Sequence, residues 1–173
     1  MKTLHKGKNK TITRDLPENA VEYSFNKIKK EKWITNSKNY CVRLLKELNI
    51  RNWEVSILFC NDEVIRELNR TYRGKDKPTD VLAFRQDDDG RFPPDTIKIH
   101  CAGDIVISID TLKKNSIDSA ESNEIELLRL LTHAMLHLLG MDHKKKNDTM
   151  LLLQEELLEK LIKQKKRGTR KLK

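Results

Sequence analysis

The chain has 173 residues and a mass of 20.3 kDa, which is enough for one domain with its own core and short for two domains. Charged residues make up 35% and hydrophobic residues 37% of the sequence, so we expect a compact core under a strongly charged surface. No apolar run approaches the roughly 18 residues of a membrane span, and the first residues lack the apolar segment of a secretory signal, so we expect a cytoplasmic protein without a membrane partner.

The net charge of +9 comes from the two ends of the chain. Residues 1–14 contain five Lys or Arg and no acid, residues 163–173 contain seven and no acid, and residues 15–162 carry a net charge of −3. Such ends suit a polyanion, because each phosphate contact releases counterions, but they are also typical of solvated tails. We divide the chain into a basic N-terminal arm (1–14), a single domain (15–162) and a basic C-terminal tail (163–173).

The three cysteines, Cys41, Cys60 and Cys101, are an odd number and form no C-x-x-C pair. This pattern indicates unpaired thiols in a reducing compartment, and buried small side chains are the simplest role for them.

The first half of the chain alternates between helical and strand patterns. Apolar spacing predicts a helix from about 37 to 49, and β-branched and aromatic residues predict a strand over 53–60. A capped helix over about 61–74, a short strand over 81–84 and a surface loop over 87–94 follow.

The second half is expected to contain one or two strands within 97–109, broken at Gly103. A capping box at Asp118 and Glu121 opens a predicted helix over 118–139, and Gly140 ends it in a left-handed conformation. A last amphipathic helix starts at Asp148.

This order of elements predicts an α/β or α+β fold. We expect a single layered domain in which a small mixed sheet of about four strands packs with about five helices. The helix that ends at Leu139 is apolar almost all round and is expected at the centre of the domain, so its polar residues must be paired, metal-bound or exposed at a cleft.

Three histidines near the end of this helix have the spacing of metal ligands. His133 and His137 are four residues apart, so they share one helix face, and Gly140 lets the chain reverse and bring His143 to the same ion. Three imidazoles with an open fourth position are typical of a catalytic zinc site, so we predict one Zn²⁺ per chain. The alternative is two core histidines and an unrelated loop histidine.

The same spacing occurs in metzincin proteases, so it does not by itself identify the substrate. Metzincins have a glutamate general base directly after the first histidine, whereas this chain has Ala134, whose methyl group cannot accept a proton. The sequence therefore disfavours peptide hydrolysis by that mechanism.

Three segments resemble a known family. Residues 133–143 are similar to the H-G-x-L-H-L-x-G-Y-D-H signature of the YbeY-type rRNA maturation factors, residues 68–84 resemble the family's L-N-x-x-Y-R-x-x-D-x-P-T-D-V-L-S-F block, and residues 103–107 resemble its G-D-I-x-I strand. The chain departs from these motifs at Ala83, Ala134 and Met141; the last two flank the predicted metal ligands and bear on the width of the pocket. The basic ends lie outside the resemblance.

The resemblance implies a single-strand-specific, metal-dependent endoribonuclease that acts in rRNA maturation and ribosome quality control. It implies that the three histidines hold the metal, usually taken as zinc, and that Arg73 lines the cleft beside it. A guanidinium can hold two phosphate oxygens, and a metal can polarise a phosphoryl oxygen and activate water. The expected partners are single-stranded RNA or rRNA, with ribosomal particles or assembly factors. Without the resemblance, the position of Arg73 directly before the predicted helix end at Gly74 indicates an ordinary surface residue.

The general base is not identified by sequence. Asp80 and Asp142 are candidates, although we favour structural roles for both, Asp80 in a turn and Asp142 as a hydrogen-bond acceptor for a ligand histidine. Glu126 and Arg129 are expected to form an ion pair. Two other functions stay open: a ribosome-assembly factor with a structural metal, and a hydrolase of another phosphate or peptide substrate on the same metal scaffold.

Overall fold

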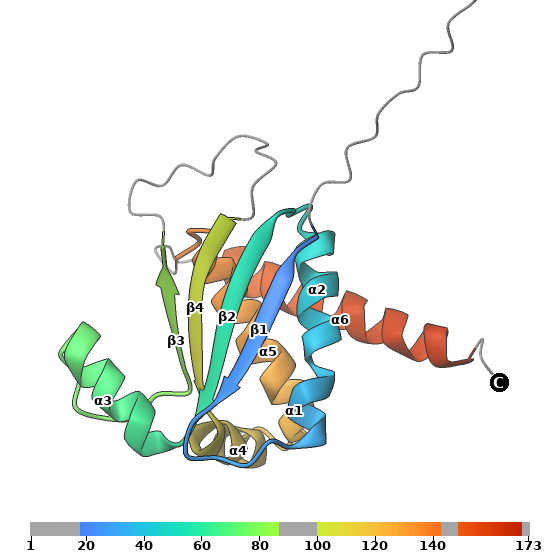
Figure 1. Ribbon diagram of the computed structural model, residues 1–173. Helices are drawn as coiled ribbons and strands as arrows, with labels where there is room; N and C mark the ends of the chain where they lie inside the picture. Colours follow the sequence, from blue (N-terminus) through green and yellow to red (C-terminus); the bar gives the residue numbers. More distant parts are fainter. Residues whose placement is uncertain (1–17, 87–99, 143–148, 171–173) are drawn as a thin grey trace, which may run out of the picture.

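The computed structural model describes residues 18–86, 100–142 and 149–170 (Figure 1). In chain order the elements are β1 (Ala20–Phe25), α1 (Lys32–Asn36), α2 (Lys38–Glu47), β2 (Trp53–Cys60), α3 (Asp62–Arg73), β3 (Val81–Arg85), β4 (His100–Ser108), α4 (Ile109–Asp118), α5 (Asn123–Leu138) and α6 (Thr149–Arg170). The predicted N-terminal arm, the loop over 87–94, His143 and Asp148 lie outside the described residues.

The four strands form one mixed sheet in the order β1-β2-β4-β3. β1, β2 and β4 are parallel, and β3 pairs antiparallel with β4. Side chains alternate along β2, with Val55, Ile57 and Phe59 fully buried and the residues between them half-buried. The predicted layered fold with a small mixed sheet is confirmed.

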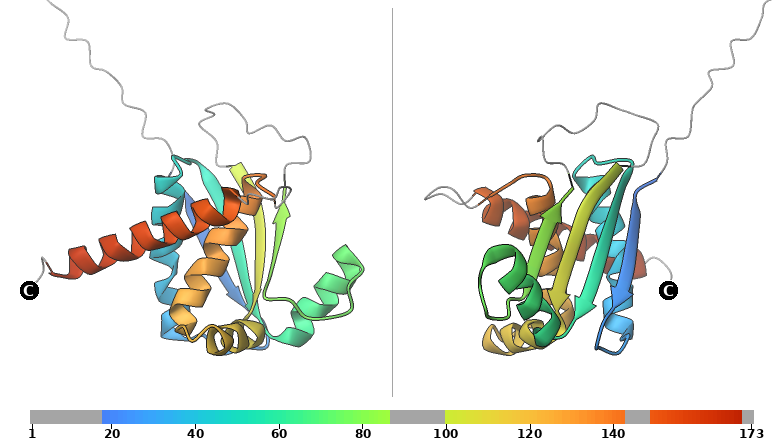
Figure 2. Two further views of the ribbon diagram at one scale, coloured as in Figure 1. Left: turned by 180° about the vertical axis from the view of Figure 1, so that it is seen from behind. Right: turned by 60° about the vertical axis from the view of Figure 1, so that its left-hand side comes forward.

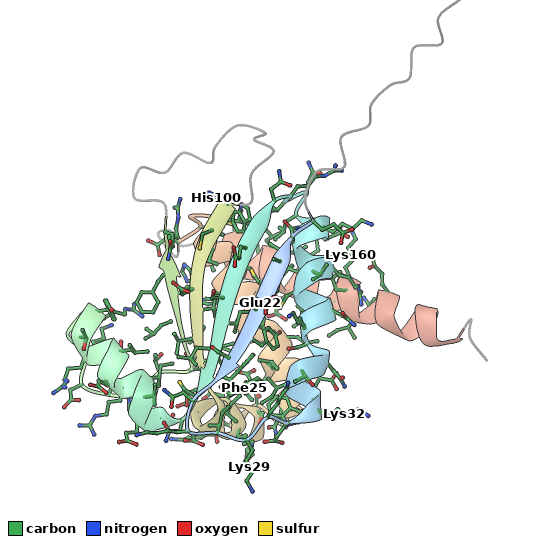
Figure 3. The ribbon with its side chains drawn as sticks, viewed as in Figure 1. Glu22, Phe25, Lys29, Lys32, His100 and Lys160 are labelled. Carbon is green, nitrogen blue, oxygen red and sulfur yellow. The ribbon has the colours of Figure 1, made fainter. Side chains whose placement is uncertain are left out.

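The helices leave the two faces of the sheet unequally covered. Seen from behind, α2 and α5 lie against the sheet and α6 crosses over them (Figure 2, left). α5 buries ten of its sixteen residues, so the prediction of a central, buried helix is confirmed. Lys160 of α6 forms an ion pair with Glu47 of α2, which ties the crossing helix to its neighbour (Figure 3). On the opposite face, α3 lies beside β3, and no helix of the described residues covers β1 and β2 (Figure 1).

The strand that was expected to break at Gly103 is continuous. Gly103 instead accompanies a shift in register between Glu54 and Val55 of β2, which is a bulge in β4. Its φ is +145°, and a Cβ there would lie 2.1 Å from the carbonyl oxygen of Phe84. Glycine is therefore required because β3 approaches β4 closely, and the prediction of a break was wrong.

The helix predicted over 118–139 is present as α5, but it begins at Asn123, so the predicted start at Asp118 was wrong. α4 ends at Asp118, and Ala120 takes a positive φ of 54° in the short connection. The cap of α5 is Ser122, whose side chain accepts a hydrogen bond from the amide of Ile125. Asp118 and Glu121 have the spacing of a capping box, but the N-cap of α5 lies four residues after Asp118.

Three further features differ from expectation. β1, α1 and α4 were not predicted. α6 continues to Arg170, so the division at residue 162 falls inside a helix. Cys101 is exposed, whereas Cys41 and Cys60 are buried, and none of the three forms a disulfide bond. No helix in the described part of the chain has the length and apolar character needed to cross a bilayer.

Candidate active site

A pocket of about 730 Å³ lies between the second half of α5, strand β3 and the last turn of α3. It brings together residues far apart in sequence: Tyr72, Arg73, Thr79, Asp80, Val81, Leu82, Ala83, Phe84, Arg85, His133, Ala134, His137 and Asp142. Two of the three segments that resemble the family, 68–84 and 133–143, therefore contribute residues to this pocket. The third, 103–107, belongs to β4, which pairs with the pocket strand β3.

His133 and His137 face each other through their Nε2 atoms, which are 3.1 Å apart. The Nδ1 atom of His133 lies 2.9 Å from Oε1 of Gln154, and the Nδ1 atom of His137 lies 2.9 Å from the carbonyl oxygen of Met141. Both partners are acceptors, so each Nδ1 must carry the proton. In the neutral imidazole with its proton on Nδ1, Nε2 carries the lone pair, and the two Nε2 atoms are the ones that face each other.

This arrangement fits a shared cation. Two imidazole nitrogens bound at 2.0–2.1 Å to a tetrahedral ion lie about 3.3 Å apart, which is close to the 3.1 Å between these Nε2 atoms. Among the described residues, no group of three His, Cys, Asp or Glu is placed to hold a metal. The third predicted ligand, His143, lies outside them, so the three-histidine site stays a prediction.

The Gln154 side chain on α6 is held in one orientation. It is 4% exposed, and its Nε2 donates to Oε1 of Glu155 at 3.0 Å, which turns Oε1 of the amide toward His133. The same Glu155 oxygen accepts from Nε of Arg129 at 3.2 Å. A line of hydrogen bonds therefore runs from a charged cluster between α5 and α6 to the imidazole of His133.

Arg129 is the centre of that cluster. Its guanidinium bonds Glu126 at 2.9 Å and Glu121 at 3.0 Å, in addition to Glu155. Hydrogen bonds from Arg129 lower the pKa of Glu121, and the carboxylates raise the pKa of Arg129. The predicted ion pair of Glu126 and Arg129 is confirmed.

Arg73 reaches the pocket from the last turn of α3. Gly74 ends that helix at a φ of +66°, and its amide donates to the carbonyl of Arg70, as its sequence position predicts. Tyr72 lines the same pocket beside Arg73, and both side chains are exposed.

Asp80 has a structural role, because both of its carboxylate oxygens accept hydrogen bonds. Oδ1 accepts from the amide of Val81 and the hydroxyl of Thr79, and Oδ2 accepts from the side chain of Asn115. These hydrogen bonds hold the residue before β3 in place, and Asp80 also lines the pocket; its predicted role in a turn stays a prediction. Asp142 lines the pocket next to the histidines.

Comparisons with known proteins match this chain to one family. The family model described as Endoribonuclease YbeY matches residues 18–162. The endoribonuclease YbeY of Treponema denticola is 47% identical over 123 residues, 69% of this chain and 78% of the relative. That of a Sulfurihydrogenibium species is 38% identical over 159 residues, 89% of this chain and 97% of the relative.

The chain belongs to the YbeY family. The prediction from the sequence motifs is confirmed, and with it the enzyme class, because these relatives are named endoribonucleases and such enzymes are hydrolases of ester bonds. A solved structure agrees on the fold: the solution structure of a Thermotoga maritima protein covers 86% of this chain and 93% of its own, with a TM-score of 0.60 and 24% identity.

Within this YbeY chain, the sequence missed two residues of the site, Arg85 and Gln154. Arg85 ends β3 opposite Gly103 and lines the pocket. A Cβ on Gly140, where φ is +84°, would lie 2.6 Å from Nη1 of Arg85, so this glycine both turns the chain and leaves room for the guanidinium. The position of Arg85 directly after the strand pattern is the one signal that the sequence offers; for Gln154 there is none.

Proposed function

We propose that this YbeY chain is a metal-dependent endoribonuclease that cleaves single-stranded RNA during rRNA maturation and ribosome quality control. Its partners are rRNA and ribosomal particles or assembly factors in the cytoplasm. The observation that carries the proposal is the pair of Nε2 atoms 3.1 Å apart in a pocket that also contains Arg73 and Arg85. The names of the relatives support the reaction class.

His133, His137 and, from its place in the motif, His143 would hold one ion. Three neutral imidazoles are a ligand set that zinc prefers, and when bound such an ion polarises a phosphoryl oxygen and makes water more acidic. The proton on each Nδ1 keeps each Nε2 available as a ligand.

The arginines supply the positive charge for the substrate. Arg73 and Arg85 reach the pocket from different elements, α3 and β3, and a guanidinium can contact two phosphate oxygens at once. We assign them to hold the scissile phosphate while charge builds on it, with Arg73 as the catalytic residue of the family motif.

Metal content and cleavage of single-stranded RNA, measured together, test the proposal. Wild-type protein is expected to hold about one zinc ion and to cleave the RNA. His137→Ala should lose the metal. Its activity should fall by more than the roughly 10- to 100-fold that is typical when only a hydrogen-bond partner of a metal ligand is removed. Arg73→Lys should keep the metal and lose cleavage, because lysine cannot present two parallel donors.

His100→Ala is the matched control, since His100 begins β4 and is not among the residues lining the pocket (Figure 3). It should keep both metal and activity. Full metal in His137→Ala would contradict the ligand assignment. Normal cleavage by a metal-free His137→Ala protein would show that the metal is not needed for catalysis.

A further inference from the structure

A second pocket lies on the sheet face opposite to α2 and α5, where the described part of the chain places no helix over β1 and β2. Its volume is about 380 Å³, within the range of small-molecule pockets, and it is lined by Ser24, Ser56, Leu58, Leu68, Tyr72, Phe84, Asp104, Ile105 and Val106. Tyr72 and Phe84 also line the active-site pocket, so the two spaces share one aromatic wall. A molecule in the second pocket would lie next to the proposed site of cleavage.

The shared wall offers an exposed ring. Tyr72 is 65% exposed, yet its ring is held edge-to-face against Phe84, with centroids 5.0 Å apart and an interplanar angle of 64°. Phe84 packs in turn against the buried side chains of Ile65, Leu82 and Val106. An aromatic ring that is anchored on one side and open on the other is a platform on which a planar base can stack.

The two pockets differ in charge. Arg73 and Arg85 line the active-site pocket together with Asp80 and Asp142, and both carboxylate oxygens of Asp80 already accept hydrogen bonds from the protein. No arginine or lysine of the described residues lines the second pocket, where Asp104 is the charged residue. A carboxylate repels phosphate but accepts hydrogen bonds from the N–H groups of a base. Because the arginines are confined to the active-site pocket, a phosphate fits beside them better than beside Asp104, whereas a base fits beside Asp104.

Asp104 is positioned to select among bases. It is half-buried on β4, and its Oδ2 lies 3.4 Å from Nε2 of Gln86. Guanine presents two adjacent N–H donors on its Watson–Crick edge and matches a carboxylate with two bonds. Uracil presents one N–H between two carbonyl oxygens, and the carboxylate repels these oxygens.

We propose that this pocket binds one nucleobase of the RNA, next to the cleaved phosphate, stacked on Tyr72 and hydrogen-bonded to Asp104, with guanine preferred over uracil. The inference rests on the proposed function and adds a base-specific contact to it. Tyr72 and Asp104 are then binding residues, with Tyr72 placed directly beside Arg73 in the chain.

The test uses the full-length, zinc-loaded chain and two single-stranded RNA octamers that differ only in having guanine or uracil beside the cleavage site. Initial rates give kcat/KM for each. Tyr72→Ala should lower kcat/KM on the guanine RNA by roughly 5- to 150-fold, since stacking on an aromatic ring has that value, while Tyr72→Phe should stay within about twofold of wild type. Metal content should be unchanged.

Asp104→Asn tests base selection separately from stacking. It should remove the preference for guanine, because an amide accepts and donates and no longer repels the carbonyls of uracil. Ile117→Ala is the control: Ile117 is 78% exposed on α4 and lines neither pocket, so its loss should change neither rate.

The outcomes separate the two proposals. A wild-type protein that cleaves neither RNA overturns the proposed function. A wild-type protein that cleaves both equally, with Tyr72→Ala and Asp104→Asn unchanged, leaves the function intact and overturns the base pocket, as would be expected if this face binds a protein instead. If Tyr72→Ala fails to fold, the guanine preference of Asp104→Asn decides alone.

Discussion

The tautomers of His133 and His137 are set by hydrogen-bond acceptors that lie outside α5. A histidine can bind a metal through Nε2 only if that atom is unprotonated, and here a carbonyl at each Nδ1 secures it. The backbone carbonyl of Met141 does so through the turn at Gly140, whereas Gln154 does so from another helix. Met141 replaces the tyrosine of the family motif, and the contact to His137 uses its backbone, so this departure does not alter the hydrogen bond.

Gln154→Leu is expected to weaken metal binding by about 10- to 100-fold, because His133 loses the acceptor that fixes its tautomer. The zinc dissociation constant, measured by competition with a chelator, reports the effect, and ¹⁵N NMR of the imidazole should show a mixture of tautomers at His133. Gln164→Leu is the control on the same helix, since Gln164 is exposed and contacts Arg43 instead. Equal zinc affinity in both variants would show that Gln154 only fills space.

At the scale of elements, the charged cluster around Arg129 joins α5 to α6 and so keeps Gln154 against His133. Glu126 is 7% exposed, and removal of its partner would leave a buried carboxylate unpaired. Glu121 is more exposed, so its ion pair with Arg129 contributes less and serves better as a probe of the cluster.

Glu121→Gln should lower the free energy of unfolding at pH 7 by about 0.5 to 1 kcal/mol. Because Arg129 lowers the folded-state pKa of Glu121, this contribution is present above the unfolded pKa of about 4.3 and disappears as the pH falls through the lower folded-state pKa. Urea unfolding between pH 7 and pH 2.5 should therefore show the variant and the wild type converging in acid.

Glu67→Gln removes an exposed carboxylate from α3 without touching Arg129 and is the control for this pH series. Its difference from wild type should stay small at every pH. A gap between Glu121→Gln and wild type that persisted below pH 3 would mean that the Glu121 side chain stabilises the protein through packing rather than charge.

Local signals made several elements predictable. Asn61 caps α3 by accepting from the amide of Val64, Gly74 ends the helix, and six of the eight residues of β2 are β-branched, aromatic or apolar. β1 is a six-residue edge strand whose Glu22 and Ser24 are exposed, so its apolar signal is weak. α4 and α5 are separated by a short connection that a periodic pattern does not reveal.

The same division holds for the site. The i, i+4 spacing of His133 and His137 predicts their convergence, because one helix contains both. Gln154 could not be predicted, since its contact with His133 depends on where α6 crosses α5, and Arg85 depends on the register of β3 with β4. Residues brought in by tertiary packing leave little local trace in the sequence.

At the scale of the whole molecule, the excess positive charge lies outside the part of the chain that contains the pocket. Residues 15–162 have a net charge of −3 and include the pocket, while the excess positive charge lies at both ends. α6 carries part of the C-terminal excess away from the sheet as a continuous helix to Arg170 (Figure 2). Contacts between RNA phosphates and the basic residues at the end of α6 would add affinity for RNA without a preference for its sequence.

Deletion of residues 163–173 tests this. It removes seven positive charges, lowering the net charge from +9 to +2, and leaves the buried Leu157, Leu158 and Leu161 of α6 in place. RNA binding should weaken mainly at low salt, while turnover at saturating RNA stays nearly unchanged. Each phosphate contact to a single strand contributes about −0.7 to the slope of log affinity against log salt, so loss of three or four contacts should flatten the slope by roughly 2 to 3 units.

A matched pair of substitutions separates position from total charge. Lys165→Gln with Arg167→Gln removes two charges from the last turns of α6, and Lys29→Gln with Lys32→Gln removes two from the start of α1 and the connection before it (Figure 3). If the C-terminal cluster holds RNA, the first pair should flatten the salt slope by about 1.4 units and the second should not. Equal slopes for the two pairs, or an unchanged slope after the deletion, would identify residues 163–173 as a solvated end and leave phosphate recognition to Arg73 and Arg85.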